Sequence, residues 1–208
     1  MSGWIRNITV LGPGVRGSRI AGYAAGRGFP VIAYGLAAEA VPAGVRLSTD
    51  LAAATREAHL IIEAVPETVS AHRDAYASLA AVAPEGAIFA TTSTLPPSDL
   101  VAFTARPDRF LALRLPDPAR QADLARQDDQ ARQDGQAGQG GQGDIGEGAA
   151  EIMGTTATSP TVLRAVARFA ADLGLVPVER RDGTTDGTTD ATTDDGARSA
   201  SIDSLRPR

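Results

Sequence analysis

A glycine-rich turn between a short apolar run and a helical pattern constrains the fold of this chain more than any other feature. The apolar run at 5–11 predicts a strand, and the spacing that follows predicts a helix. Between them stand Gly12, Gly14 and Gly17 in the pattern G-x-G-x-x-G. Gly12 permits a tight turn, Gly14 permits close approach of a pyrophosphate, and Gly17 permits close packing of the helix on the strand. The pattern predicts a dinucleotide site, against the alternative of a purely structural glycine turn.

The second strand, predicted at 29–34, completes a βαβ unit but lacks the usual ribose ligand. At its end an acidic residue normally binds the adenosine ribose hydroxyls, and here Gly35 stands instead. The nearest carboxylate is Glu39, and no arginine follows at once to bind a 2′-phosphate. Either Gly35 only makes a turn and the grip on the cofactor is weaker, or Glu39 compensates. This segment therefore specifies neither NAD nor NADP.

Strands alternate with helices along the rest of the chain. This alternation predicts an α/β fold with a doubly wound, mostly parallel Rossmann-like sheet. One dinucleotide-binding domain is expected over 1–180, with a low-complexity insertion at 119–148 and a disordered tail at 181–208. Further strands are predicted at 45–48, 59–65, 87–91, 110–115 and 175–178, and helices at 14–25, from Thr49 or Asp50 to Thr55, at 66–83, at 97–104, and from Pro160 with Ser159 as its N-cap.

Composition limits the partners and the compartment. The chain has 208 residues, 43% of them hydrophobic, and a formal net charge of −5, so it offers no basic field for nucleic acid or an anionic membrane. It contains no lysine, and the absence of cysteine excludes disulfides and thiolate metal sites. No apolar run is long enough to span a membrane, and the N-terminus lacks a signal-peptide core. A cytoplasmic protein is expected, and no metal site is predicted.

Four segments carry a resemblance to a known family. They are ITVLGPGVRGSRIA (8–21), AHLIIEAVPETVSAHRD (58–74), AIFATTSTLPPSDL (87–100) and RPDRFLALRLPDP (106–118). In this order and spacing they resemble the NAD-binding domain of 3-hydroxyacyl-CoA dehydrogenases, over 5–118 and again over 149–178. The resemblance implies NAD as cofactor, an acyl-CoA substrate, and oxidation of its 3-hydroxyl in fatty-acid metabolism. In that family the Rossmann-like domain is followed by a helical C-terminal domain.

The resemblance also assigns catalytic positions. The family's general-base histidine corresponds to Arg114, its orienting glutamate to Glu151, and its substrate-contacting serine to Ser93. Arginine stays protonated at accessible pH, so Arg114 does not abstract a proton. Either Arg114 and Glu151 form a salt bridge in place of the His–Glu dyad, or Glu151 is only a charged strand-end residue. Ser93 is alternatively a turn residue.

The cofactor contacts implied by the resemblance extend beyond the glycine loop. Glu67 corresponds to a cofactor-contacting glutamate, His72 stands at a lysine position, and Asp117 replaces an asparagine near the nicotinamide. The alternatives are that Glu67 is only a favourable acid in the first turn of a helix and that His72 is a solvated helix residue. The residues expected to bind the cofactor are Gly12, Pro13, Gly14, Val15, Arg16, Gly17, Gly35, Glu67, His72 and Asp117.

Two parts of the family pattern are missing from the sequence. A short connection replaces the helical pair that contacts CoA before the strand at 45–48, and a Thr/Asp repeat follows Val178 in place of the helical domain. Three functions remain: a dehydrogenase with Glu151, Ser93 or a water as base, a non-catalytic dinucleotide-binding module, or a pseudoenzyme acting with a partner subunit. Weak or absent turnover is expected, with a homo-oligomer or partner subunit supplying the missing helical domain.

Overall fold

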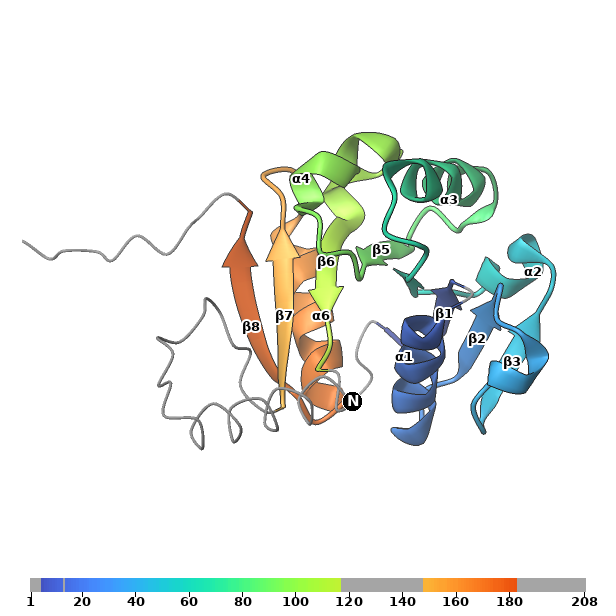
Figure 1. Ribbon diagram of the computed structural model, residues 1–208. Coiled ribbons are helices and arrows are strands. Elements are labelled where there is room, and N and C mark those ends of the chain that lie inside the picture. Colours follow the sequence, from blue (N-terminus) through green and yellow to red (C-terminus); the bar gives the residue numbers. More distant parts are fainter. Residues whose placement is uncertain (1–4, 13, 117–147, 183–208) are drawn as a thin grey trace, which may run out of the picture.

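The computed structural model describes residues 5–12, 14–116 and 148–182, and these form one sheet with helices on both faces (Figure 1). Within these residues the sheet has eight strands. The strands are β1 (Ile8–Leu11), β2 (Val31–Tyr34), β3 (Val45–Ser48), β4 (Leu60–Glu63), β5 (Ile88–Thr91), β6 (Phe110–Arg114), β7 (Ala149–Gly154) and β8 (Val176–Arg181). The α-helices are α1 (Val15–Gly26), α2 (Leu51–Thr55), α3 (Val69–Val82), α4 (Pro97–Leu100) and α6 (Pro160–Asp172), and the 3-10 turns are η1 (Ala38–Ala40), η2 (Val101–Phe103) and η3 (Pro107–Arg109).

The strand order is β3-β2-β1-β4-β5-β6-β7-β8. Neighbouring strands are parallel from β3 to β6, β7 runs antiparallel to β6, and β8 runs parallel to β7. The direction in which strands are added reverses between β1 and β4, which makes this the topological switch point where ligands bind in such sheets. The doubly wound, mostly parallel Rossmann-like sheet is therefore confirmed.

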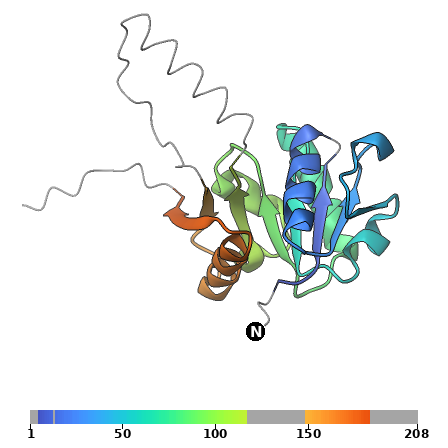
Figure 2. The same ribbon diagram turned by 90° about the horizontal axis from the view of Figure 1, so that it is seen from below.

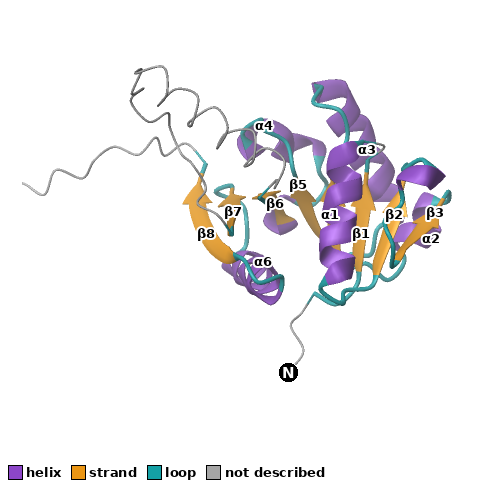
Figure 3. Cartoon of the chain, turned by 60° about the horizontal axis from the view of Figure 1, so that its bottom comes forward, coloured by secondary structure: helices purple, strands orange, loops and turns teal. Residues whose placement is uncertain are grey.

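The core has two parts because the strands alternate their side chains between the two faces of the sheet. On one face, Ile20 of α1 and Val166 of α6 pack against the sheet, and on the other Tyr76 and Leu79 of α3 do so with Leu100. Figure 3 shows the helices on both sides of the strands. Figure 2, seen from below, places β8 and α6 at one end of the sheet and β2 and β3 at the other.

The predicted elements are present, and several of their ends differ. Helix α3 begins at Val69 rather than at Pro66, because the Thr68 side chain caps it by accepting from the Ala71 amide. The helix predicted at 97–104 divides into α4 and η2, and the last strand continues beyond Val178 to Arg181. In the described part of the chain no helix is both long and apolar enough to cross a membrane.

Helix caps and the apolar face of α6 follow the sequence prediction. Asp50 caps α2 by accepting from the amides of Ala52 and Ala53, and Ser159 caps α6. The four residues predicted to form the apolar face of α6 are all buried. They are Val162, Val166, Phe169 and Leu173.

Candidate functional site

The glycine loop between β1 and α1 is shaped by close backbone contacts. At Gly12, where φ is +140°, an added Cβ would lie 2.3 Å from the carbonyl oxygen of Ala64. At Gly17 it would lie 2.9 Å from the carbonyl oxygen of Gly12, whereas at Gly14 nothing lies within 4 Å. Gly12 and Gly17 are thus required by the fold, and Gly14 leaves open space over the loop. The pattern is that of a loop that a pyrophosphate approaches.

The start of α1 suits an anion. Gly14 is its N-cap, no side chain caps the helix, and its first turn contains no acidic residue. The amide groups and the positive dipole end of this twelve-residue helix therefore face outward at the edge where phosphates bind in such folds. The residues present fit a dinucleotide at this position. Val15 lies exposed at the start of α1, and Pro13 lies outside the described residues.

Gly35 makes the turn after β2. Its φ of +81° is a conformation that favours glycine, which agrees with the first of the two alternatives for this position. Glu39 is exposed in η1, and this turn is fastened to α1 by the Ser18 hydroxyl, which donates to the carbonyl of Ala40 at 2.6 Å. Compensation for the missing ribose ligand by Glu39 stays a prediction.

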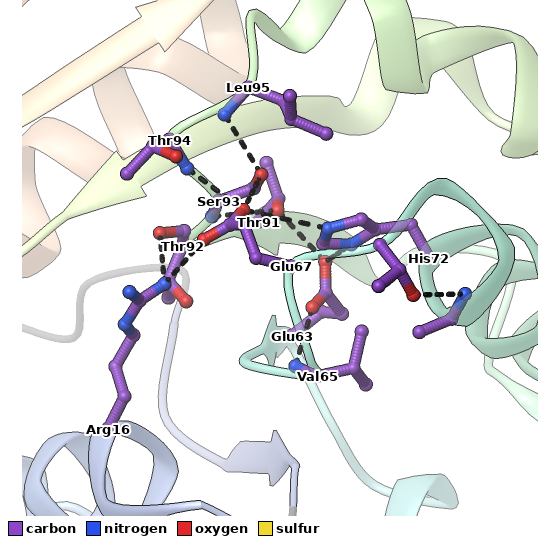
Figure 4. A network of polar contacts seen from close by, with 12 residues as sticks. Arg16, Glu63, Val65, Glu67, His72, Thr91, Thr92, Ser93, Thr94 and Leu95 are labelled. Atoms are coloured by element: carbon purple, nitrogen blue, oxygen red, sulfur yellow. Dashed lines mark hydrogen bonds and ion pairs between the residues drawn. The ribbon is translucent and has the colours of Figure 1, made fainter.

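Glu63, at the end of β4, is the centre of a buried polar cluster (Figure 4). Its Oε2 accepts from the hydroxyls of Tyr76 and Thr91 at 3.1 and 2.8 Å and lies 2.9 Å from Nδ1 of His72. Its Oε1 accepts from the amide of Val65 at 2.7 Å. Burial and the nearby Glu63 carboxylate raise the pKa of Tyr76 well above its ordinary value, so the phenol keeps its proton and donates.

Glu67 lies next to this cluster and faces outward. Its Oε1 accepts from the Ser93 hydroxyl and from the Thr94 amide, and its Oε2 lies 3.2 Å from Nη1 of Arg16 (Figure 4). Partial burial raises the pKa of Glu67, but the hydrogen bonds from Ser93, Arg16 and Thr94 outweigh it, so the pKa lies below its ordinary value. Because Arg16 also donates to the Thr92 carbonyl, it bridges the glycine loop to the ends of β4 and β5.

His72 is buried, and the alternative that it is a solvated helix residue is wrong. Its side chain is 1% exposed, since α3 turns this position toward the end of β4. Its Nε2 lies 3.7 Å from Oε1 of Glu67 and has no hydrogen-bond partner among the described residues. The hydrogen bond with Glu63 outweighs the effect of burial and raises the pKa of His72. His72 thus stands between two glutamates.

Arg114 and Glu151 form the ion pair that was one of the two alternatives. The antiparallel register of β6 and β7 places them opposite each other, with Nη1 of Arg114 2.9 Å from Oε2 of Glu151. The other carboxylate oxygen of Glu151 lies 3.1 Å from Nε of Arg180 on β8. Arg114 also donates to the carbonyl of Ser93 at 3.1 Å. Glu151 is therefore held between two arginines.

The structure brings most of the predicted site residues to one edge of the sheet. Ser93 is buried and directs its hydroxyl to Glu67, so its contact with a substrate stays a prediction. Asp117 lies outside the described residues. Glu63, Tyr76, Thr91 and Arg180 also belong to this region and were not predicted from the sequence. A signal for Glu63 was present in the sequence, because it ends the otherwise apolar strand 60–63. A glutamate buried at the end of a strand needs hydrogen-bond partners.

Comparisons with known proteins agree with this geometry. Residues 36–125 match the model of the NAD-binding domain of 3-hydroxyacyl-CoA dehydrogenases. A solved diketoreductase is 36% identical, with a TM-score of 0.69 over 88% of this chain and 66% of that one. The 3-hydroxybutyryl-CoA dehydrogenase of Escherichia coli, 21% identical, shares the fold with a TM-score of 0.66 over 86% of this chain and 38% of that one. No sequence among the curated proteins matches.

The solved relatives are longer than the part of them that this chain covers. The chain covers 66% of the diketoreductase and 58% of an NAD⁺-dependent pyridine carboxylic acid dehydrogenase, which is 23% identical with a TM-score of 0.66 over 86% of this chain. The matched part is in each case a Rossmann-like unit.

Proposed function

Because this chain belongs to the 3-hydroxyacyl-CoA dehydrogenase family through its NAD-binding domain, we propose that it binds NAD and NADH over the glycine loop and interconverts a 3-hydroxyacyl compound with its 3-oxo form. The cofactor, when bound, supplies the hydride chemistry. The observation that carries this proposal is the open space above Gly14 beside the uncapped start of α1. The residues that would hold the dinucleotide are those of the glycine loop together with Arg16 and Glu67.

The substrate is proposed to be a compound with a carbonyl or hydroxyl at the 3-position. The family match supports an acyl-CoA, and the 36% identical diketoreductase acts on dicarbonyl compounds. Turnover is expected to be slow. Arg114 stands where the family has its histidine, and a general base is commonly worth about 10² to 10⁴ in rate.

A second chain is proposed to complete the substrate cleft. This chain covers between 38% and 66% of the solved relatives described above. A second copy or a partner subunit would supply the other wall of the cleft. The alternative function is a dinucleotide-binding module that transfers no hydride by itself or a pseudoenzyme that supports such a partner.

The test is titration of the protein with NAD and NADH by calorimetry, comparing Gly14→Ala with Gly26→Ala. Both glycines have no neighbour within 4 Å of an added Cβ, so both variants are expected to fold. Only Gly14→Ala places a methyl group over the loop, and it is expected to weaken dinucleotide binding at least tenfold while Gly26→Ala leaves it unchanged. Failure of the wild type to bind either dinucleotide at millimolar concentration would reject the proposal.

An assay then separates the enzyme from the binding module. The protein is incubated with NADH and either acetoacetyl-CoA or ethyl acetoacetate, and the loss of NADH absorbance is followed. Slow turnover that disappears in Gly14→Ala supports the enzyme. Binding without turnover supports the non-catalytic module.

A further inference from the structure

The carboxyl edge of the sheet lacks an obvious group to move a proton. Arg114 stays protonated at accessible pH, and Glu151 has each of its carboxylate oxygens next to an arginine. The Ser93 hydroxyl is buried and already engaged with Glu67. A reduced carbonyl nevertheless requires a proton for the alkoxide that forms on hydride addition. If a protein side chain supplies that proton, it is a different one of this region.

His72 is the histidine at this edge. The chain contains two histidines, and the other, His59, stands at the beginning of β4, where its amide donates to the carbonyl of Asn7 at the opposite edge of the sheet. His72 Nδ1 faces Glu63 at 2.9 Å, and because a buried carboxylate accepts, Nδ1 carries a hydrogen. Nε2 then faces Glu67 Oε1 at 3.7 Å without a hydrogen-bond partner among the described residues.

This geometry favours one additional proton in the cluster. A lone pair on Nε2, which is itself buried, would point at a carboxylate oxygen. A hydrogen on Nε2 turns the same approach into an attraction. The titratable or charged groups around the ring are Glu63 on β4, Glu67 after β4 and Tyr76 on α3, and Arg16 on α1 lies on the far side of Glu67.

The side chain of Glu67 lies between the buried ring of His72 and the solvent. Its side chain is 34% exposed, whereas those of His72 and Glu63 are 1% exposed. It also lies beside the loop that binds the dinucleotide, where Arg16 reaches across to it. Figure 4 shows Glu67 between Arg16 on one side and His72 with Glu63 on the other. A proton on Nε2 of His72 would therefore leave toward Glu67, whose Oε1 must approach from 3.7 Å to accept it.

We propose that His72 stores the proton consumed in carbonyl reduction and that Glu67 delivers it, so that the Glu63–His72–Glu67 cluster replaces the histidine base that this chain lacks. The inference rests on the proposed function. In the step, hydride adds to the carbonyl carbon and the carbonyl π pair becomes the alkoxide. The imidazolium of His72 releases the proton on Nε2 to the carboxylate of Glu67 as Glu67 passes a proton to the alkoxide, and the step ends with a neutral imidazole, an ionised Glu67 and an alcohol. Neutral His72 is reprotonated from water through Glu67.

Two directions of pKa shift bear on where the proton rests between turnovers. The hydrogen bond with Glu63 raises the pKa of His72, and, despite partial burial of Glu67, the hydrogen bonds from Ser93, Arg16 and Thr94 lower the pKa of Glu67, so the proton rests on His72 and Glu67 is ionised. His72 acts through Glu67 and is a positioning and supplying residue. Glu67 is the group that meets the reacting atoms.

The first test needs no turnover. Imidazole proton resonances of the two histidines are followed against pH by NMR, and His59→Asn assigns them. Glu67→Gln is expected to lower the pKa of His72 clearly, because the neutral amide no longer stabilises the imidazolium. Glu85→Gln, an exposed residue in the turn before β5, is the matched control and is expected to leave it unchanged. An unchanged His72 titration in Glu67→Gln overturns the proposal whatever the activity.

The second test measures reduction of acetoacetyl-CoA by NADH as a function of pH. In the wild type, kcat is expected to be level at low pH and to fall as pH rises through the pKa of His72. His72→Asn, which retains a group able to donate to Glu63, is expected to lower kcat about 10² to 10⁴-fold and to remove this pH dependence, with NADH affinity unchanged. If His72→Asn does not fold, Glu67→Gln is expected to lower kcat and remove the pH dependence in its place.

The outcomes separate the two proposals. If the wild type does not bind NADH, or binds it without reducing the carbonyl, the proposed enzymatic function is rejected and the cluster has no catalytic role. The NMR titration still decides in that case whether Glu67 stabilises a proton on His72. A wild type that reduces the carbonyl, with variants that retain its kcat and pH profile, overturns this inference and leaves the proposed function standing.

Discussion

Arg114 and Glu151 face each other across the antiparallel strands β6 and β7, with Nη1 and Oε2 2.9 Å apart. The side chains are 24% and 10% exposed, so the ion pair is largely shielded from water. The position predicted to correspond to the family's general base is thus occupied by an ion pair. Its guanidinium also donates to the carbonyl of Ser93, which joins the end of β6 to the turn after β5.

We expect Arg114→Ala to lower the free energy of unfolding by about 2 kcal/mol, because it leaves a mostly buried carboxylate with one of its two arginines and frees the Ser93 carbonyl. The matched control is Arg168→Ala, which removes the exposed pair with Asp172 at 3.0 Å on α6 and is expected to change it by less than about 0.5 kcal/mol. Urea unfolding measures both. Equal effects of the two substitutions would contradict the structural role of the pair.

Arg114→His is expected not to restore robust dehydrogenase activity. The new imidazole would face Glu151, but that carboxylate would remain next to Arg180 on β8, which would compete with the imidazole for it. The measurement is the rate of NAD reduction with 3-hydroxybutyryl-CoA. A gain of about 10² or more would show that the altered base is the main defect.

Gly12→Ala is expected to destabilise the fold by more than about 2 kcal/mol, since a side chain there adopts an unfavourable φ and meets the backbone of Ala64. Gly26→Ala, in an open position at the end of α1, is the control and is expected to leave stability unchanged or slightly higher. Thermal unfolding followed by circular dichroism compares them. Unchanged melting of Gly12→Ala would argue against the turn described for the loop.

Glu63→Ala is expected to cost about 3 kcal/mol or more, because it leaves several buried donors without their acceptor. These are the hydroxyls of Tyr76 and Thr91, Nδ1 of His72 and the amide of Val65. Glu57→Ala, at an exposed position, should change stability by less than about 0.5 kcal/mol. The free energies come from urea unfolding, and a small effect at Glu63 would mean that the cluster reorganises around water.

Stability is expected to fall as pH rises above the ordinary pKa of histidine. The folded-state pKa of His72 is raised above 6.5, chiefly by its hydrogen bond with Glu63, so its contribution is complete below that pH and is lost as pH rises through the folded-state value. Urea unfolding across this window should show the fall in the wild type and in His59→Asn. It should be absent in His72→Asn, and its persistence there would assign it to another group.

The fold could be predicted from the sequence because its signals are local. The glycine pattern, the caps at Asp50 and Ser159, and the apolar face of α6 each depend on neighbours within a few positions. The buried cluster depends on three elements meeting. Glu63 ends β4, whereas His72 comes from α3 and Thr91 from β5. His72 shares a helix face with Tyr76 and Leu79, but a single histidine among apolar residues does not indicate which strand end it meets. Its burial was therefore missed.

The Arg114–Glu151 pair could be proposed because the family positions suggested it, but the role of Arg180 could not. The sequence 180–183 resembles the start of the polar tail, and β8 continues through Arg181 only because β7 provides a parallel partner, with Met153 opposite Arg180. Tertiary pairing thus overrode the local polar composition, and it brought a second cation to Glu151.

The antiparallel pairing of β6 and β7 has a consequence for the length of the connection between them. Arg114 stands opposite Glu151, so the chain leaves the sheet at Pro116 and returns at Gly148 along the same margin. Lengthening a connection whose two ends are already neighbours costs only about 0.6 kcal/mol per doubling of its length. Additional residues can therefore be inserted at this junction without disturbing the pairing of β6 with β7, and any inserted segment would be held next to the Arg114–Glu151 ion pair.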